Sequence, residues 1–479
     1  MYCLIAPILA ILCSIYAYGY SLNERRFMLR FINHFYGDFT RQELKKYLFL
    51  GGIFALTIGL IWSLMPLRDT VFCNLVIGFA NCYGRELREM YIAWAKLVSL
   101  GLMIPAVMGY DLLLSKIKKR NALMVLGGIY AGLLLLFAGY FKFAHGIVIN
   151  NPTPWMISAW LWYTLIDSLT MLFISAFWAF VLDISDEKSA QKGFGLIIMI
   201  SQLGGMTMPI LFNKLPHLIS IQVPGMALVA SIVMVLIAVM VHYFLMHTPP
   251  QLLAGYHASH DGSHAVSKGS WYGLRLILSS RYLMILLGMG ICFDFMVNLL
   301  DFNFKTMTFA AYDTLVDAGI YLSRYASLVN MTTFFLLLFG ISGISRRFGL
   351  RASFSLVFAA LLIAIGTFAL SPSISTVMWM LLVSKAIQYS LNSPSMKQLY
   401  VPTSKEVKYH GQTWIETIGS SGAKTASAMA GSTKTYLGFA LYVSVTSYVC
   451  AGLLGLWLVL ALMAVRMHDK AVKNDTFIA

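Results

Sequence analysis

The chain has 479 residues, of which 59% are hydrophobic and 11% are charged. A soluble protein of this size carries about 25% charged residues, and six cysteines form no disulfide framework. Water-soluble, disordered and disulfide-rich secreted classes are therefore excluded, and an all-α polytopic membrane protein is predicted. The net charge is +15, but in a membrane protein such an excess marks loops on one side. No nucleic-acid partner is inferred from it.

About 13 apolar segments are long enough to cross a bilayer, which takes about 20 residues. The first covers residues 1–20, and the others form a 12-helix core. In chain order the core segments lie near residues 47–67, 92–114, 122–141, 155–182, 193–212, 224–246, 282–303, 327–345, 352–370, 376–393, 412–433 and 436–465.

Basic residues in the loops orient the predicted helices. If the loop 21–46 is cytoplasmic, most loop Lys and Arg residues fall on the cytoplasmic side. The opposite side then holds Arg85, Arg88, Lys142, Lys214, Arg324 and Lys434. This asymmetry is a positive-inside signal and places the C-terminus in the cytoplasm.

Loop symmetry predicts two six-helix halves. The basic run 118-KKR-120 after the second core helix has a counterpart in 346-RR-347 after the eighth. A duplicated unit of this kind is typical of the major-facilitator architecture. The predicted organisation begins with an extra N-terminal helix (1–20), a cytoplasmic basic segment (21–46) and the N-terminal half (47–246). A cytoplasmic linker (247–281), the C-terminal half (282–466) and a cytoplasmic tail (467–479) follow.

Two of these segments have alternative interpretations. Residues 1–20 could be a signal peptide, but the positive charges follow the segment, which favours an uncleaved anchor. The linker holds His247, His257, His260 and His264. Imidazoles can ligate zinc, but this spacing matches no tight motif, so we expect a solvated linker and no metal.

Charged residues inside the predicted spans are the main functional signal. Each costs about 2.5–3.5 kcal/mol at the bilayer centre on insertion scales, so each calls for a partner or a role. The basic residues are Arg68, Lys96, Lys305, Lys385 and Lys424, and the acidic ones are Asp69, Asp111, Asp167, Asp183, Asp294, Asp301 and Glu416. We interpret Lys385 and Asp111 as residues near span ends that snorkel to the interface.

Four of these residues form the predicted substrate site: Arg68, Asp301, Lys305 and Lys424. They come from the first, seventh and eleventh core helices, and transporter sites lie near the midplane between the halves. Asp301 and Lys305 are four residues apart, so they share a helix face and could pair. Cations in a cavity of low dielectric would bind a small anionic substrate. The alternative is that they are buried ion pairs that fix helix register.

Coupling or gating is the predicted role of Asp69, Lys96, Asp167, Asp183, Asp294 and Glu416. No enzyme motif is present: GxxxxGK[ST], HExxH, paired CxxC and GxSxG are all missing. The run 419-GSSGAKTAS-427 is Gly-rich, but no strand precedes it. We therefore expect no catalysis, no cofactor and no ATP hydrolysis, and transport driven by exchange or by an ion gradient.

Several stretches resemble the nucleotide transporter family, the ATP/ADP translocases of plastids and intracellular bacteria. They are 67-LRDT-70, 177-FWAFVLDIS-185, 298-NLLDFNFK-305, 384-SKAIQYSLNSPSMKQLYVP-402 and 411-GQTWIETIGSSGAK-424. The last three are similar to the family's NLVEVTWK, SKAxKYSLFDPxKExxYIP and GKxxIDxxGSRxGK. The matches keep their order across the 12-helix core.

The resemblance implies a major-facilitator-like fold and anionic substrates such as ATP and ADP. Arg68, Asp301, Lys305 and Lys424 fall on family positions of the same charge. Two departures matter. A substrate-associated Lys of the family is Val71 here, and a family Glu aligns with Ile166, with Asp167 one residue along, or about 100° around a helix. We expect less positive potential for a triphosphate.

The predicted function is secondary active nucleotide transport across a bacterial inner membrane, with no required oligomer. Two alternatives stay open. One is proton-coupled transport of a non-nucleotide anionic metabolite, which the uncharged Val71 supports. The other is a transport-dead receptor or scaffold, which the embedded charges argue against.

Overall fold

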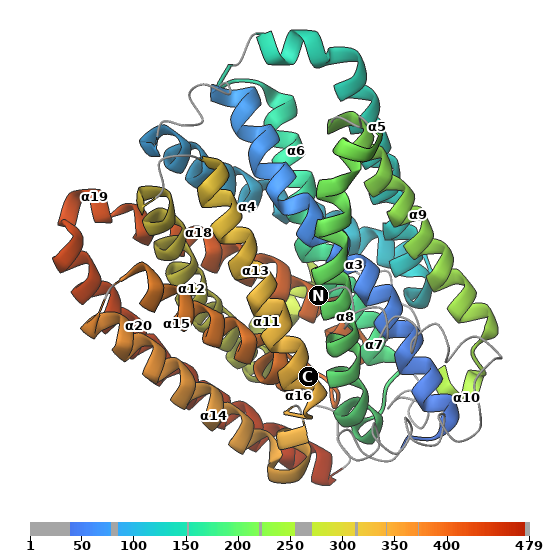
Figure 1. Ribbon diagram of the computed structural model, residues 1–479. Coiled ribbons are helices and arrows are strands. Elements are labelled where there is room, and N and C mark those ends of the chain that lie inside the picture. The colour runs from blue at the N-terminus through green and yellow to red at the C-terminus, as the bar shows by residue number, and fades with distance from the viewer. Residues whose placement is uncertain are drawn as a thin grey trace, which may run out of the picture.

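The computed structural model describes residues 39–77, 85–150, 153–219, 223–253, 271–311, 315–341, 343–371 and 373–474. These residues are helical apart from short turns, and ten of their helices are long and apolar enough to cross a membrane. The predicted N-terminal helix, residues 1–20, lies outside the described residues. Figure 1 shows long helices side by side, with α14 and α20 at one edge and α5 and α9 at the other.

The N-terminal half contains six long helical segments. The fourth is interrupted by a π-helical turn, η3, between α6 and α7, and the short η2 (Lys119–Asn121) precedes α5. The bounds are α3 (Arg41–Ile77), α4 (Arg85–Lys116), α5 (Ala122–Asn150), α6 (Ile157–Ser168), η3 (Leu169–Phe173), α7 (Ile174–Asp183), α8 (Glu187–Ile219) and α9 (Val223–His247).

The C-terminal half follows two short helices, α10 (Pro250–Leu253) and α11 (Tyr272–Ser279), which lie within the predicted linker. Its fourth and fifth segments contain the π-helical turns η4, η5 and η6. The bounds are α12 (Arg281–Ala311), α13 (Leu315–Leu338), α14 (Gly343–Leu370), α15 (Ile374–Ile387), η4 (Gln388–Asn392), α16 (Ser393–Leu399), η5 (Val407–Gly411), α17 (Gln412–Trp414), η6 (Ile415–Gly419), α18 (Ser420–Ser432), α19 (Lys434–Leu437) and α20 (Phe439–Asn474).

Helix packing repeats between the two halves. In the N-terminal half α3 packs along α8 and α5 along α9; in the C-terminal half α12 packs along α18 and α14 along α20. The halves meet where α8 packs on α13 and α4 packs on α18, again at equivalent helices. These paired contacts agree with the major-facilitator-like fold expected from the loop symmetry.

Close contact between α3 and α8 depends on small residues, most clearly on Gly204. A Cβ atom at Gly204 would lie 1.9 Å from the carbonyl oxygen of Ala55, so no larger side chain fits without moving a helix. Glycine at such a crossing lets two backbones approach and interlock. The N-terminal half is therefore held as one tightly packed unit.

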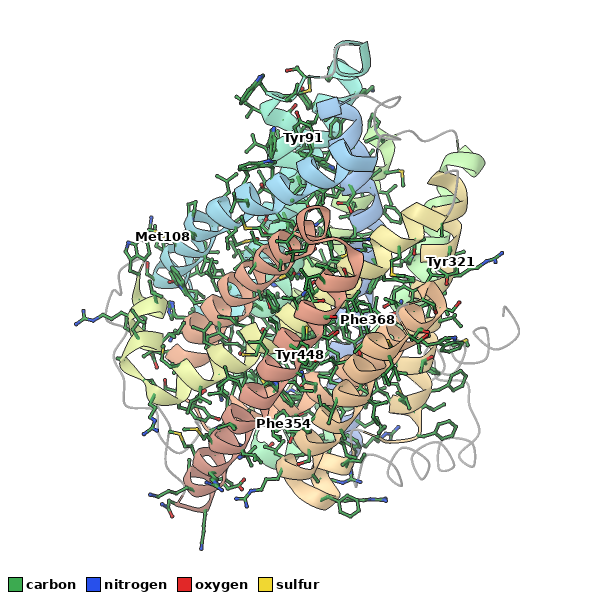
Figure 2. All side chains as sticks on the ribbon, turned by 90° about the vertical axis from the view of Figure 1, so that its left-hand side faces the viewer. Tyr91, Met108, Tyr321, Phe354, Phe368 and Tyr448 are labelled. Carbon is green, nitrogen blue, oxygen red and sulfur yellow. The ribbon has the colours of Figure 1, made fainter. Side chains whose placement is uncertain are left out.

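Apolar side chains cover the outer faces of the edge helices. Leu136 on α5 is 69% exposed and Tyr448 on α20 is 79% exposed. Figure 2 labels Tyr448 on α20 and Phe354 and Phe368 on α14, which packs along α20; Phe354 is buried and packs edge-on against Trp457. Apolar surface of this extent is unfavourable in water and is expected where a protein faces lipid.

Several predicted boundaries are displaced. The segment placed at 327–345 is α13, which ends at Leu338; the chain then turns through Gly340, whose φ is 72°. A left-handed φ ends a helix and favours glycine. At the termini of the core, α3 begins at Arg41, inside the predicted basic segment, and α20 continues to Asn474, into the predicted tail.

Candidate functional site

A shared cation joins the first and fourth segments of the N-terminal half. The Arg68 guanidinium on α3 donates from Nε to Asp69 Oδ1 at 2.8 Å and from Nη1 to Asp167 Oδ1 on α6 at 3.0 Å. The Ser99 hydroxyl on α4 donates to the other Asp167 oxygen at 2.7 Å. The guanidinium carbon lies 4.2 Å from the Tyr163 ring centroid. Arg68 is buried, and both of its acidic partners lie within its own half.

In the C-terminal half the equivalent segments, the first and the fourth, are joined by a shared anion. Asp301 on α12 accepts from Lys305 Nζ at 2.7 Å through Oδ2 and from Lys385 Nζ at 3.0 Å through Oδ1. Lys305 lies one turn along α12, whereas Lys385 lies on α15. The Lys305 side chain is 54% exposed, while those of Lys385 and Asp301 are 16% and 14% exposed.

Two further lysines face this region without an ion pair among the described residues: Lys96 and Lys424. Lys96 lies on α4 within electrostatic reach of Arg68, Asp301 and Lys305. The ammonium of Lys424 on α18 lies 3.4 Å from the sulfur of Met171 in η3, so it crosses to the other half. Its hydroxyl-bearing neighbour, Thr425, lies 3.4 Å from the Lys96 carbonyl oxygen.

These side chains form one charge cluster, defined as Arg68, Asp69, Lys96, Asp167, Asp294, Asp301, Lys305, Lys385 and Lys424. Lys424 lies within electrostatic reach of Asp167 in the N-terminal half and of Asp294 and Lys385 in its own half. The cluster therefore contains interacting charges from both halves. Asp294 accepts a hydrogen bond from the Ser420 hydroxyl. With ordinary ionisation the charge cluster has five cations and four carboxylates, so it retains a positive charge with which to bind an anion.

Glu416 has its own partners one turn away from Ser420. It pairs with Lys397 and accepts from Gln412 Nε2 at 2.9 Å. The Lys397 ammonium lies 5.3 Å from the centroid of Trp178, a residue of the N-terminal half. Glu416 therefore belongs to a contact between the halves, next to the charge cluster.

Asp183 lies at one end of the bundle, in a set of contacts that we name the basic end: Asp111, Lys119, Arg120 and Asp183 of the N-terminal half with residues 406–414 of the other. Asp183 is 3.6 Å from Arg120 Nε and accepts from the Tyr409 hydroxyl at 3.3 Å. Burial, reinforced by the Asp183 charge, raises the pKa of Tyr409 well above its usual range, so Tyr409 stays a neutral donor.

Asp111 is fully buried within the basic end. It lies 2.7 Å from His410 Nδ1 and accepts from Trp414 Nε1 at 2.8 Å. Lys119 adds an ion pair of 3.2 Å with Glu406. The two halves are therefore bound together at this end by several polar contacts.

The interpretation of Lys385 and Asp111 as snorkelling residues is wrong. Lys385 lies in the charge cluster on Asp301, and Asp111 is enclosed by His410 and Trp414. At the family's Glu position, Ile166 is buried in the apolar core and Asp167 faces Arg68. The sequence analysis did not place Lys385 with the predicted site residues, although a lysine inside a span with few charges was a usable signal.

Irregular helix geometry coincides with the charge cluster. The π-turn η3 begins two residues after Asp167, and η4 begins three residues after Lys385. A further π-turn, η6, precedes Lys424 by one helical turn. Such turns occur frequently at functional sites because they re-aim side chains within a helix.

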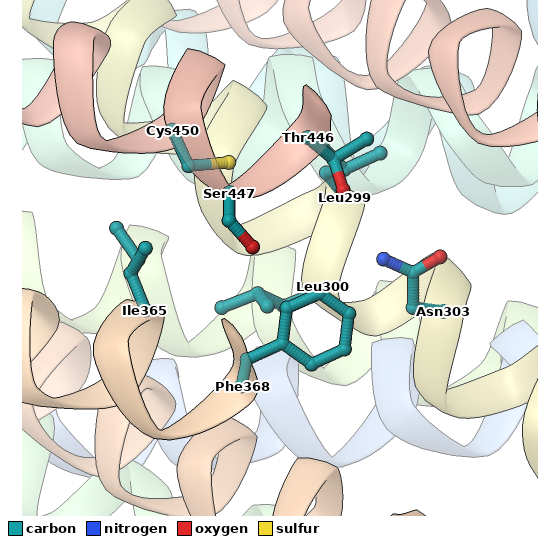
Figure 3. Close-up of a pocket in the computed structure, with 8 residues that line it drawn as sticks. All are labelled: Leu299, Leu300, Asn303, Ile365, Phe368, Thr446, Ser447 and Cys450. Atoms are coloured by element: carbon teal, nitrogen blue, oxygen red, sulfur yellow. The ribbon is translucent and has the colours of Figure 1, made fainter. Parts of the chain in front are cut away.

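Apolar pockets elsewhere do not suit an anion. Figure 3 shows a small pocket between α12, α14 and α20, lined by Leu299, Leu300, Asn303, Ile365, Phe368, Thr446, Ser447 and Cys450. It holds no charged side chain. Among the described residues, no group of three or more His, Cys, Asp or Glu side chains could hold a metal ion.

Ten apolar helices around a charge cluster, packed as two similar halves, are the architecture of a multi-pass membrane transporter. A model of the TLC ATP/ADP transporter family matches residues 147–470, and the chain belongs to this family. Similar curated proteins include ADP,ATP carrier protein 4 of Rickettsia conorii, 21% identical over 443 residues (81% of this chain and 84% of that protein). The protein of the same description from Rickettsia typhi is 23% identical over 452 residues, with the same shares covered.

Solved structures show the fold alone at this level of identity. A bacterial homologue of the iron transporter ferroportin in an outward-facing state has a TM-score of 0.59 at 14% identity, covering 89% of this chain and 99% of that one. The Escherichia coli fucose:proton symporter FucP has a TM-score of 0.58 at 13% identity, covering 88% and 99%. The major-facilitator-like fold expected from the sequence is confirmed.

Proposed function

We propose that the chain carries an anionic nucleotide across a bacterial inner membrane, either in exchange for another nucleotide or together with protons. The observation that carries the proposal is the pair Lys96 and Lys424, two cations on opposite halves that have no ion pair among the described residues. Relatives named ADP,ATP carriers support the nucleotide as the class of anion. The basic loops support a cytoplasmic placement of both termini of the core.

Phosphate oxygens would bind to Lys424, Lys96 and Lys305. The ammonium groups of Lys424 and Lys96 have no ion pair among the described residues, and that of Lys305 is paired with Asp301 of its own helix. Together the three lysines come from both halves. Arg68 acts differently from the sequence-based expectation, because both of its acidic partners lie within its own half. Its role in the proposal is to hold α3 against α6. Asp301 holds the lysines when substrate is absent.

Alternating access would open and close the two ends of the bundle around the charge cluster. At the basic end, the contacts from Asp111 to His410 and Trp414 join the halves and would break when the cluster opens to that side. Coupling or gating roles fall to Asp69, Asp167 and Asp294 within the cluster, and to Asp183 and Glu416 at contacts between the halves.

Proton-coupled transport of a non-nucleotide anion is the second candidate function. Val71, at the family's Lys position, is buried in the apolar core, so no cation replaces the missing one there. The remaining cations would suit a substrate with fewer charges than a triphosphate. A pH gradient would then drive uptake into liposomes that contain no counter-substrate.

The test is uptake by purified protein in proteoliposomes, using labelled ATP, ADP, GTP, NAD and pyrimidine nucleotides, with and without the same compound inside. Uptake that requires internal nucleotide would establish exchange. Uptake driven by a pH gradient into empty liposomes would establish proton coupling. A folded protein that transports none of these nucleotides contradicts the nucleotide proposal, and lack of transport of other organic anions would favour the scaffold alternative.

Lys424→Gln tests the site within the same assay. Lys424 has no ion pair to lose among the described residues, so we expect a folded protein whose kcat/KM for uptake falls at least about tenfold, the value of one charge-assisted hydrogen bond. Arg351→Gln is the matched control: it also removes a cation, but from a solvent-exposed pair with Asp469. Equal losses in both variants would remove Lys424 from the site.

A further inference from the structure

Equivalent helices of the two halves carry ion pairs of opposite polarity. In the N-terminal half the first helix supplies the cation, Arg68, and the fourth supplies the anion, Asp167. In the C-terminal half the first helix supplies the anion, Asp301, and the fourth supplies the cation, Lys385. Both pairs precede a π-turn of the fourth helix by two or three residues. The pairs therefore occupy corresponding places in the duplicated fold.

In the C-terminal pair the shared group has a partner that largely faces solvent, whereas the most exposed partner of Arg68 in the N-terminal pair, Asp69, is 31% exposed. Asp301 is almost buried and has two lysine partners, of which Lys305 is 54% exposed and Lys385 is 16% exposed. Removing the sole partner of a buried carboxylate is strongly unfavourable. With two partners present, one of them can leave while the carboxylate stays compensated.

We propose that Lys385 is a positioning residue that keeps Asp301 paired, so that Lys305 is free to turn from Asp301 to the phosphate of the substrate. This inference rests on the proposed function, since it assigns the behaviour of the same site. Lys385 itself touches no substrate. Its ammonium compensates Asp301 from the α15 side throughout the transfer of Lys305.

A purely mechanical role for Lys385 makes a different prediction. If its ion pair only ties α15 to α12, its removal lowers the amount of folded protein and the maximum rate, and leaves KM unchanged. If it frees Lys305, its removal leaves Lys305 as the last partner of Asp301. The substrate must then compete with Asp301 for Lys305, and KM rises.

The experiment compares Lys385→Met, Lys385→Arg and the double variant Asp301→Asn/Lys385→Met with the wild type, measuring KM and maximum uptake rate per folded transporter. We expect Lys385→Met to raise KM about tenfold or more, the cost of competing with one charged hydrogen bond. Lys385→Arg keeps the cation and should stay within about threefold of the wild type. The double variant removes the competing carboxylate, so its KM should fall most of the way back to the wild-type value. A Lys385→Met variant with normal KM, or no recovery in the double variant, overturns the inference.

A second readout needs no substrate. The rate at which an amine-reactive reagent modifies Lys305, followed by mass spectrometry on detergent-purified protein, reports whether Asp301 holds its ammonium. Lys385→Met should slow the modification of Lys305 several-fold, and the double variant should restore it. An unchanged rate contradicts the inference. Absence of nucleotide uptake by the wild type contradicts the proposed function instead, and the labelling rates then decide the inference alone.

Discussion

Equivalent helices of the two halves carry ion pairs in which the charges are exchanged. In the N-terminal half one cation, Arg68, lies between two carboxylates and is almost completely buried. In the C-terminal half one carboxylate, Asp301, lies between two cations, one of them largely exposed. A central cation with two acids has no positive charge to spare, while a central acid with two lysines does.

Duplication of a fold therefore does not duplicate the function of its parts. The pair in the N-terminal half acts as a support, because its groups satisfy each other within one half. The pair in the C-terminal half includes a largely exposed cation, Lys305, which we propose moves to the substrate. Lys96 and Lys424, which have no ion pair among the described residues, lie one on each half, and in the proposed function they complete the anion-binding surface between the halves.

Removing the shared cation of the N-terminal half should give the largest effect. Arg68→Met leaves Asp69 and Asp167 without their cation in a buried site, which costs about 3–5 kcal/mol. Lys385→Met leaves Asp301 with Lys305, so it should cost much less. Thermal unfolding in detergent should show a clear fall in midpoint for Arg68→Met and a small one for Lys385→Met.

The paired control is Arg68→Met combined with Asp167→Asn, which neutralises one of the two stranded acids. We expect the unfolding midpoint of this double variant to lie above that of Arg68→Met, because fewer uncompensated buried charges remain. Equal midpoints for Arg68→Met and Lys385→Met would show that the two halves do not differ as their geometry indicates.

Much of this fold was predictable from the sequence, because continuous apolar runs and basic loops follow directly from the bilayer as solvent. The boundary of α13 was misplaced for a physical reason. Asp317 and Arg324 lower the local hydropathy of its first half, and an average over residues does not detect the break at Gly340.

Embedded charges were also visible in the sequence, but their partners were predictable only within one helix. The spacing of Asp301 and Lys305 fixes a shared face, and the structure has that pair at 2.7 Å. Arg68 and Asp167 lie 99 residues apart, and their contact follows from tertiary packing. The same holds for Lys385 and Asp111, because position near a span end does not determine burial.

At the basic end the charged groups contact the opposite half, unlike the Arg68 and Asp301 ion pairs, which each lie within one half. Asp111→Ala removes the acceptor of two buried donors, on His410 and Trp414, and should cost about 1–3 kcal/mol. We also expect the contact between halves to loosen. A cysteine introduced at Thr413, which is fully buried at this end, should react with a thiol reagent faster in the Asp111→Ala background.

A reaction rate at that cysteine independent of Asp111 would show that this end stays closed without the buried carboxylate. The wild-type residue at 111 with the same introduced cysteine supplies the baseline. Because the measurement compares accessibility and not transport, it separates loosening of the basic end from damage to the charge cluster.

The smallest effect is expected at the partly exposed pair of the basic end. Lys119→Ala removes a 3.2 Å ion pair with Glu406, whose side chains are 30% and 21% exposed. Exposed ion pairs are worth about 0–1 kcal/mol because water and salt screen them, so the unfolding midpoint should move little. The difference from wild type should shrink further as salt rises, whereas the loss in Asp111→Ala should persist. If Lys119→Ala lowered the unfolding midpoint as much as Asp111→Ala does at high salt, the exposed ion pairs would hold the halves together at this end. The buried contacts of Asp111 would then not be what keeps it closed.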